Sequence, residues 1–338
     1  MEMNAGIDFV ITWVDGTDPA WRARKAAHAR EDLAAASGEY RYRDWGLLRY
    51  WFRCVEKNAS WVRKIHLVTC GQTPKWLNLD NPKLNLVNHE DFIPSEYLPT
   101  FSIRPIELNL HRIEDLAEQF VFFNDDMFCI APVQQEDFFR NGLPVDLAAL
   151  NVHCYTMLDP VMLCVVRDVG LVNKYFTMSK SIAANRRKWL TPKAGAYLAR
   201  TLVLLKCPRF PGFYVHHCSQ PFLKDTYQAI WEAEPALLHD TCMHRFRTSS
   251  DVNCWVFKFW QLASGSFVPA SAAKYRYMSI NSLEAAQDAA ALIMTSKTPH
   301  VCFNDSDALA HEEFERCAAI IRSSFEACYP EPSSFEIV

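Results

Sequence analysis

Several signatures of common enzyme classes are missing from this chain of 338 residues. It contains no G-x-x-x-x-G-K-[ST] loop, no G-x-G-x-x-G, no G-x-S-x-G elbow and no H-E-x-x-H. P-loop hydrolases, Rossmann dehydrogenases, α/β-hydrolase esterases and zincin proteases are therefore disfavoured. An excess of positive charge is also missing, because 35 Lys and Arg stand against 39 Asp and Glu. That balance argues against a nucleic-acid-binding protein.

Long apolar runs and paired cysteines are scarce as well. No uncharged stretch offers the roughly 18 apolar residues that a membrane-spanning helix needs, and the run 259–273 is interrupted by Gly265 and Pro269. Residues 1–8 carry acidic charge and lack the apolar segment of a secretory signal, so we expect a cytoplasmic protein. The twelve cysteines include no C-x-x-C pair, which favours reduced core thiols over zinc sites or disulfides.

The residues that are present suit a folded protein with a large core. Half of them are hydrophobic and 13% are aromatic. In the N-terminal half, short apolar runs alternate with segments of helical periodicity. The predicted strands are 7–14, 64–69, 84–87 and 120–123, and the predicted helices are 44–58 and 106–119. This alternation predicts an α/β fold with a mixed, largely parallel sheet.

The second half of the chain is expected to differ in character. Residues 169–265 combine tryptophans, charged residues and several prolines, which predicts a mainly helical subdomain or lid. A strand at 300–303 and an amphipathic helix at 309–328 follow. We therefore expect three segments: an α/β core at 1–168, the helical subdomain at 169–265, and a return to the core at 266–338.

Acidic residues follow apolar strands at distant places in the sequence. Asp125 and Asp126 come directly after one strand, Asp305 comes after another, and Asp15 ends a third. Ligands of parallel α/β sheets collect at the carboxyl ends of the strands. Carboxylates there suit Mg²⁺ or Mn²⁺, which take oxygen ligands and bridge nucleotide phosphates. Capping of the following turn or helix explains the first pair equally well, and would be preferred for Asp305 taken alone. The repetition favours a shared metal site.

Two other groups suit proton transfer and phosphate binding. His216 and His217 are adjacent, and a neutral imidazole can accept a hydroxyl proton near pH 7. Hydrogen-bonded core histidines are the commoner alternative. Arg245 and Arg247 precede Ser249, Ser250 and Asp251, where a helix N-cap would add donors for a phosphate. For Arg245, a surface salt bridge is the preferred interpretation. Separate acids, a histidine and arginines fit metal-assisted transfer from a sugar nucleotide.

Four ordered blocks of the sequence carry a family resemblance. They are IDFVITWVDGTDPAW, the segment from YRDWGLLRYWF to FVFFNDDMF, the pair HHCSQPFLKD and HRFRTSSDVN, and HVCFNDSD. These blocks, which run from about Ile7 to Asp307, resemble the conserved regions of the Stealth family. That family comprises hexose-1-phosphate transferases, among them bacterial capsular polysaccharide phosphotransferases and the catalytic core of the animal N-acetylglucosamine-1-phosphotransferase.

The resemblance implies an activity. A sugar 1-phosphate, with N-acetylhexosamine 1-phosphate as the expected case, would pass from a UDP-sugar to a hydroxyl of a glycan acceptor, and UMP would be released. The bond broken would be the phosphoanhydride, so the anomeric configuration of the sugar would be unchanged. We expect a Rossmann-like, glycosyltransferase-A-like core with a helical subdomain.

The resemblance also implies roles for residues at the motif positions. Asp125, Asp126 and Asp305 would surround Mg²⁺ or Mn²⁺, with Asp125 also catalytic. His217, in the pattern H-x-x-x-P, would be the general base, and Arg247 would hold donor phosphate. His216 is the second choice for the base. Substrate or nucleotide contacts are implied for Trp13, Asp15, Gly16, Arg43, Asp44, Arg104, Arg112 and Asp251, with Glu107 and His111 as weaker candidates.

The long recognition modules of the animal enzymes are absent, so the chain resembles the bacterial members that build capsule or cell-surface polysaccharide. Its expected partners are a nucleotide sugar and a glycan or lipid-linked glycan, with no nucleic acid and with peripheral contact at the inner face of the membrane. The amphipathic helix at 309–328 offers such a contact, but core packing is the preferred use of its apolar face. Two alternatives stay open: a conventional metal-dependent glycosyltransferase that releases UDP, and a non-catalytic glycan-binding protein.

Overall fold

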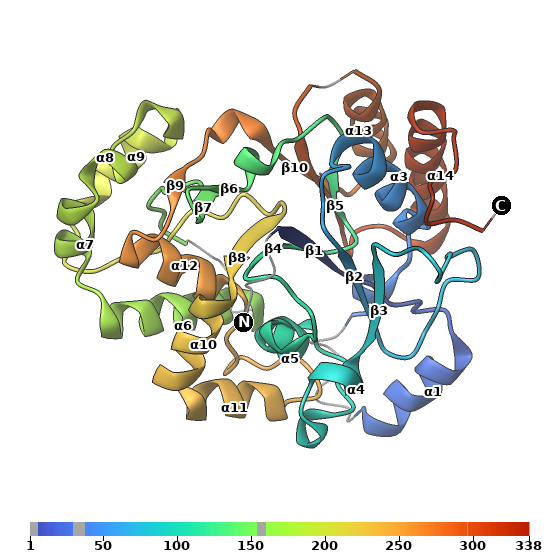
Figure 1. Ribbon diagram of the computed structural model, residues 1–338, viewed down its shortest axis with the longest axis horizontal. Coiled ribbons are helices and arrows are strands. Elements are labelled where there is room, and N and C mark those ends of the chain that lie inside the picture. Colours follow the sequence, from blue (N-terminus) through green and yellow to red (C-terminus); the bar gives the residue numbers. More distant parts are fainter. Residues whose placement is uncertain (1–5, 30–37, 154–159, 296, 338) are drawn as a thin grey trace.

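A five-stranded sheet forms the centre of the computed structural model, which describes residues 6–29, 38–153, 160–295 and 297–337 (Figure 1). The acidic start of the chain, residues 1–5, lies outside the described residues. The strands are β1 (Ile7–Thr12), β2 (Ile65–Thr69), β3 (Leu84–Asn88), β4 (Gln119–Phe123) and β8 (Gln220–Leu223), in the order β3-β2-β1-β4-β8. Four of them are parallel and β8 is antiparallel to β4. The predicted α/β class with a mixed, largely parallel sheet is confirmed.

The order of the strands determines where a ligand site can form. The chain runs from β1 outward to β2 and β3, and then returns to the other side of β1 for β4. The connections therefore diverge between β1 and β4, and a crevice is expected at the carboxyl ends of these two strands. Every residue of β1 is buried, as expected for a parallel strand covered on both faces.

Two small sheets extend the core. In the first, β10 (Tyr275–Ile280) is parallel to β11 (His300–Asp305), and β11 is antiparallel to β5 (Met127–Cys129). This pairing carries the end of β11 to the end of β4, and the Phe303 amide donates to the Asp126 carbonyl at 2.9 Å. The second sheet consists of β6 (Phe139–Arg140), β7 (Leu143–Asp146) and β9 (Val268–Pro269).

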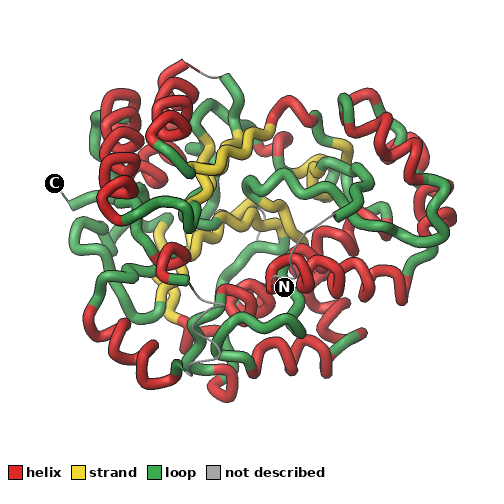
Figure 2. The backbone as a smooth tube through the Cα atoms, turned by 180° about the vertical axis from the view of Figure 1, so that it is seen from behind, coloured by secondary structure: helices red, strands yellow, loops and turns green. Residues whose placement is uncertain are grey.

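Helices cover both faces of the central sheet, and the strands run through the middle of the molecule in Figure 2. On one face pack α3 (Leu48–Asn58), α13 (Leu283–Thr295) and α14 (His311–Cys328), joined to the sheet through Phe9 and Phe123. On the other face pack α5 (Ile103–Asn109), α10 (Lys224–Ala233), α11 (Pro235–Met243) and α12 (Trp255–Ser264). The further helices are α1 (Pro19–His28), α4 (His89–Phe92), α6 (Pro160–Tyr175), α7 (Met178–Ala184), α8 (Arg186–Trp189) and α9 (Tyr197–Leu204).

Some predicted elements need correction. The helix predicted at 106–119 is wrong in extent, because α5 starts earlier, capped by the Ser102 side chain, and gives way to a 3₁₀ turn at Leu110–Arg112. Asp115 then adopts a left-handed φ of 59°, which a continuing helix excludes. The helix predicted at 44–58 begins only at Leu48, after Gly46 with φ of 69°.

The C-terminal helix α14 uses its apolar face for core packing, as preferred from the sequence. Phe314, Ile321 and Phe325 of this helix are buried. No helix in the described ranges is long and apolar enough to cross a bilayer. The division into segments at 168 and 265 stays a prediction; the middle segment supplies β8 to the central sheet.

Candidate active site

A cavity of about 520 Å³ lies at the carboxyl ends of β1, β4 and β11, where the strand order places the crevice. Its wall includes Trp13 after β1, Asp125 and Asp126 after β4, and Asp305 at the end of β11. Other predicted residues in the wall are Arg43, Asp44, Arg104, Glu107, His217 and Arg247. The fold therefore gathers residues that lie far apart in the sequence.

The acidic side of the cavity consists of carboxylates that repel one another. Burial raises the pKa of Asp125 well above its usual value, and the charges of Asp126 and Asp44 raise it further. Burial also raises the pKa of Asp126 to about 6, with a contribution from Asp305. Asp126 Oδ2 accepts from Cys302 Sγ at 3.3 Å, whereas its buried Oδ1 has no hydrogen-bond partner in the described chain. This side of the cavity suits a bound cation.

Asp305 is held by an arginine from the other end of the sequence. Arg43 Nε lies 3.0 Å from Asp305 Oδ2, and Arg43 Nη2 donates to Asp305 Oδ1 at 3.1 Å and to the Ser306 carbonyl at 2.8 Å. Burial raises the pKa of Asp305, although Arg43 opposes the shift. Asp305 does not cap α14, whose N-cap residue is Ala310. The capping alternative is therefore wrong for Asp305, and Arg43 positions this carboxylate.

His217 faces the cavity from a strained turn just before β8. Its φ of 54° lies in the left-handed region, which is uncommon for a residue with a side chain and is typical of functional positions. The ring lies perpendicular to Trp255 at 5.3 Å and 5.5 Å from Tyr277. Burial lowers the pKa of His217 to about 4, and its Nδ1 has no hydrogen-bond partner among the described residues. The imidazole is thus neutral and able to accept a proton.

The neighbouring His216 is committed to a buried polar network outside the cavity wall. Its Nδ1 accepts from the Cys218 amide at 3.2 Å, and its Nε2 lies 3.3 Å from Lys258 Nζ and 3.4 Å from Asp146 Oδ1. The ring stacks on Tyr275 at 3.9 Å. His216 therefore anchors the turn that presents His217.

A group of arginines also lines the cavity. Burial lowers the pKa of Arg247 to about 10, and the positive charges of Arg41 and Arg104 lower it further. Arg41 also lines the cavity, and sequence reasoning missed it; the only signal was its place in the run YRYRD beside two predicted residues. Three like charges in one partly buried wall suit an anionic ligand.

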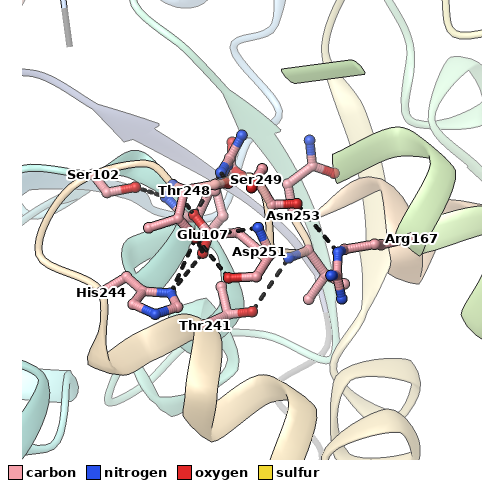
Figure 3. Close-up of polar contacts among 12 residues, drawn as sticks. Ser102, Glu107, Arg167, Thr241, His244, Thr248, Ser249, Asp251 and Asn253 are labelled. Atoms are coloured by element: carbon pink, nitrogen blue, oxygen red, sulfur yellow. Dashed lines mark hydrogen bonds and ion pairs between the residues drawn. The ribbon is translucent and has the colours of Figure 1, made fainter. Parts of the chain in front are cut away.

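Asp251 shapes the loop that carries Arg247 (Figure 3). It forms an ion pair with Arg104, accepts from the Thr248 amide at 2.9 Å, and lies 2.7 Å from His244 Nδ1. The helix N-cap expected at residues 249–251 is wrong, because α12 begins at Trp255 after Cys254. Asp251 is absent from the cavity wall and acts through Arg104 and the loop.

Glu107 is a second buried acid on the arginine side. Its Oε2 accepts from the Cys254 amide at 3.4 Å, and the residue lines the cavity. Burial raises the pKa of Glu107 to about 7, although the positive charges of Arg247 and Arg104 lower it in part.

Besides His216 and Asp251, the predicted residues Asp15, Gly16, His111 and Arg112 also lie outside the cavity wall. Asp15 Oδ1 accepts from the Thr17 amide at 2.8 Å and so folds its own turn. Gly16 allows a close approach, since a Cβ there would lie 2.0 Å from the Tyr42 carbonyl oxygen. The other two lie beside Trp231: Arg112 above its ring at 5.0 Å and His111 at 6.2 Å. Their functional roles stay predictions.

The carboxylates fit a divalent cation that brings further ligands of its own. Within the described ranges, no three Asp, Glu, His or Cys side chains are arranged to hold a metal ion by themselves. Mg²⁺ commonly binds through one or two carboxylates and completes its coordination with water and substrate phosphates. Asp126 Oδ1, which has no hydrogen-bond partner among the described residues, and the neighbouring acids can supply these carboxylate ligands.

The fold and the cavity define an α/β protein with a polar ligand site at the carboxyl edge of its sheet. Models of Stealth protein CR1, conserved region 1, and Stealth protein CR2, conserved region 2, match residues 6–28 and 41–145. The chain is 36% identical to capsular polysaccharide phosphotransferase WcwK of Streptococcus pneumoniae, with 98% of each chain covered. It is 38% identical to receptor polysaccharide phosphotransferase WefC of Streptococcus oralis, with 98% and 99% covered. The chain belongs to the Stealth family.

A solved structure of the galactosyltransferase LgtC, in complex with donor and acceptor sugar analogues, is a distant structural neighbour. The two chains are 9% identical, and their alignment covers 95% of each chain with a TM-score of 0.39.

Proposed function

We propose that this chain transfers a sugar 1-phosphate from a UDP-sugar, with UDP-N-acetylhexosamine as the donor, to a hydroxyl of a glycan in capsule or cell-surface polysaccharide synthesis. The observation that carries the proposal is that one cavity gathers buried carboxylates, a group of arginines and a neutral histidine in its wall. The names of the relatives, phosphotransferases of capsular and receptor polysaccharides, support the same class of reaction.

The proposed reaction takes place at the phosphorus that carries the sugar. The acceptor oxygen forms a bond to this phosphorus while the phosphoanhydride bond to the second phosphorus breaks. The hydroxyl proton passes to the His217 imidazole, and UMP leaves with the bridging oxygen. The glycosidic C–O bond is untouched, so the product is a phosphodiester between the sugar and the acceptor.

Other residues would bind the donor phosphates and the metal ion or position these groups. Arg247, next to Arg41 and Arg104, binds phosphate oxygens and offsets the charge on the transferred group. Asp125, Asp126 and Asp305 would hold Mg²⁺ or Mn²⁺, which when bound neutralises charge on the diphosphate. Arg43 and Asp251 position Asp305 and the Arg247 loop.

The released nucleotide tests the proposal against its main alternative. Purified protein, UDP-N-acetylglucosamine, Mg²⁺ and a panel of glycan acceptors are incubated together, and the nucleotide is identified by chromatography. UMP supports phosphoryl transfer, whereas UDP would identify a conventional glycosyltransferase. His217→Ala should abolish UMP release. His311→Ala, which changes an exposed histidine outside the cavity wall, is the matched control and should keep UMP release.

A further inference from the structure

The basic residues of this acidic chain are concentrated in one segment. Residues 169–224 contain ten Lys and Arg and no Asp or Glu. The rest of the sequence therefore contains the remaining 25 of the 35 basic residues and all 39 acidic ones. The formal net charge of the whole chain is −4. Such a separation of charge indicates a surface that meets a negatively charged partner.

The structure gathers most of these cations on a peripheral part of the molecule. We call residues 178–209, which include α7, α8 and α9, the basic lobe. In Figure 1 the basic lobe lies at one end of the long axis, opposite α14, and Figure 2 shows the same arrangement from behind. Its exposed cations are Lys180, Arg186, Arg187, Lys193, Arg200, Lys206 and Arg209.

The charges of the basic lobe are not neutralised by acidic side chains. None of its exposed cations forms a salt bridge with a residue that the structure describes; the ion pairs of the described chain lie elsewhere. Among the described residues, Arg200 donates a hydrogen bond only to the neutral Asn151 side chain. A cluster of cations that repel one another without internal counter-ions is best satisfied by an external anionic surface.

Apolar side chains project from the same surface. Leu202 and Val203 of α9 are 49% and 70% exposed, directly between Arg200 and Lys206 in the sequence. The preceding Thr201 is fully buried, and the fully buried Trp189 packs in an apolar core that the lobe shares with α6 and α12. The exposed pair is thus displayed on a structured helix.

We propose that the basic lobe binds the surface of a membrane that contains anionic lipids, with Leu202 and Val203 entering the interfacial region. Cations beside exposed apolar residues are the combination that anionic bilayers bind, through charge attraction and burial of apolar area together. A soluble polyanion would use the cations but would gain nothing from the apolar pair. No residue of the basic lobe lines the cavity, and the proposal does not rest on the proposed reaction.

Sedimentation with vesicles tests this proposal on the full chain. The probes are vesicles of phosphatidylcholine with 30% phosphatidylglycerol and vesicles of phosphatidylcholine alone. The charge variant combines Arg186→Gln, Arg187→Gln and Lys206→Gln. Its matched control combines Arg22→Gln, Lys75→Gln and Arg316→Gln, which removes the same charge from exposed positions outside the lobe. A third variant combines Leu202→Ser and Val203→Ser.

The parent chain should bind the anionic vesicles and release them as salt is raised. At roughly fivefold per cation, the charge variant should bind about 100-fold more weakly, while the control stays within a few-fold of the parent chain. The serine variant should also bind more weakly at constant charge. Equal loss in the charge variant and the control would overturn the proposal. Unchanged binding in the serine variant, with dextran sulfate competing fully, would overturn it in favour of a soluble polyanion. Circular dichroism establishes that each variant is folded.

Discussion

The buried ion pair between Asp146 and Lys258 gives the sharpest prediction about stability. Lys258 Nζ donates to both carboxylate oxygens of Asp146, and neither side chain reaches solvent. Burial alone would raise the pKa of Asp146, but Lys258 and His216 outweigh it and lower this pKa to about 2. Removing one partner leaves the other charge buried and unpaired, which typically costs about 3–5 kcal/mol.

We therefore expect Lys258→Met and Asp146→Asn each to lower the free energy of unfolding by about 3–5 kcal/mol. The double variant should lose less than the sum of the two by about 2–3 kcal/mol, because no charge is left unpaired. Urea unfolding followed by tryptophan fluorescence measures the stability of the parent chain, the two single variants and the double variant. Lys174→Met, which breaks an exposed pair with Glu234, is the matched control and should change stability far less.

The pH dependence follows from the lowered pKa of Asp146. Folded Asp146 binds its proton less tightly than unfolded Asp146, so its contribution to stability is complete above about pH 4 and disappears between pH 4 and pH 2. Asp146→Asn should remove this part of the acid transition. Additive single losses, or an acid transition that is identical in Asp146→Asn, would refute the assignment of a coupled buried pair.

Three further predictions concern packing, the acidic side of the cavity and buried histidines. Gly16→Ala should destabilise the fold severely, because the added methyl group would clash with the Tyr42 carbonyl. Gly170→Ala, inside α6 with open space around it, should instead raise the free energy of unfolding by about 0.5–1 kcal/mol. Thermal denaturation measures both changes. Asp126→Asn should raise the melting temperature at pH 8 in EDTA, since it removes a repelled carboxylate, yet should abolish metal-dependent turnover; a lower melting temperature would contradict this reasoning. Five buried or half-buried histidines have lowered pKa values and protonate more readily when unfolded, so they should make stability fall as the pH drops from 6.5 towards 4. Asp126 and Glu107, whose pKa values are raised, oppose part of this loss. Acid titration of unfolding checks this, and a flat profile would contradict it. The five histidines are His89, His111, His216, His217 and His300.

The sheet could be predicted because its strands are short, continuous apolar runs. β1, β2 and β4 lie where the pattern puts them, within two residues. The helix at 106–119 was mispredicted because apolar periodicity continues past Asn109, while the left-handed Asp115 ends the regular backbone. Local pattern does not report a positive φ at a residue other than glycine.

The gathering of acids was predictable for a related reason, since residues after parallel strands meet at one edge of the sheet. The partners of these acids were not predictable. Arg43 contacts Asp305 across 262 positions, and only the pairing of β11 with β5 brings the second acidic turn to the first. Two adjacent histidines also look alike in sequence, whereas the left-handed turn directs His217 to the cavity and His216 into a buried network.

The fate of the phosphorus attached to the sugar tests the central proposal most directly. UDP-N-acetylglucosamine labelled with ³²P at that phosphorus is incubated with the protein, Mg²⁺ and a glycan acceptor that supports turnover. We predict that the label moves into the acceptor in a phosphodiester and that the released UMP is unlabelled. Label that stays with the nucleotide while sugar appears on the acceptor would show glycosyl transfer and contradict phosphoryl transfer at this cavity.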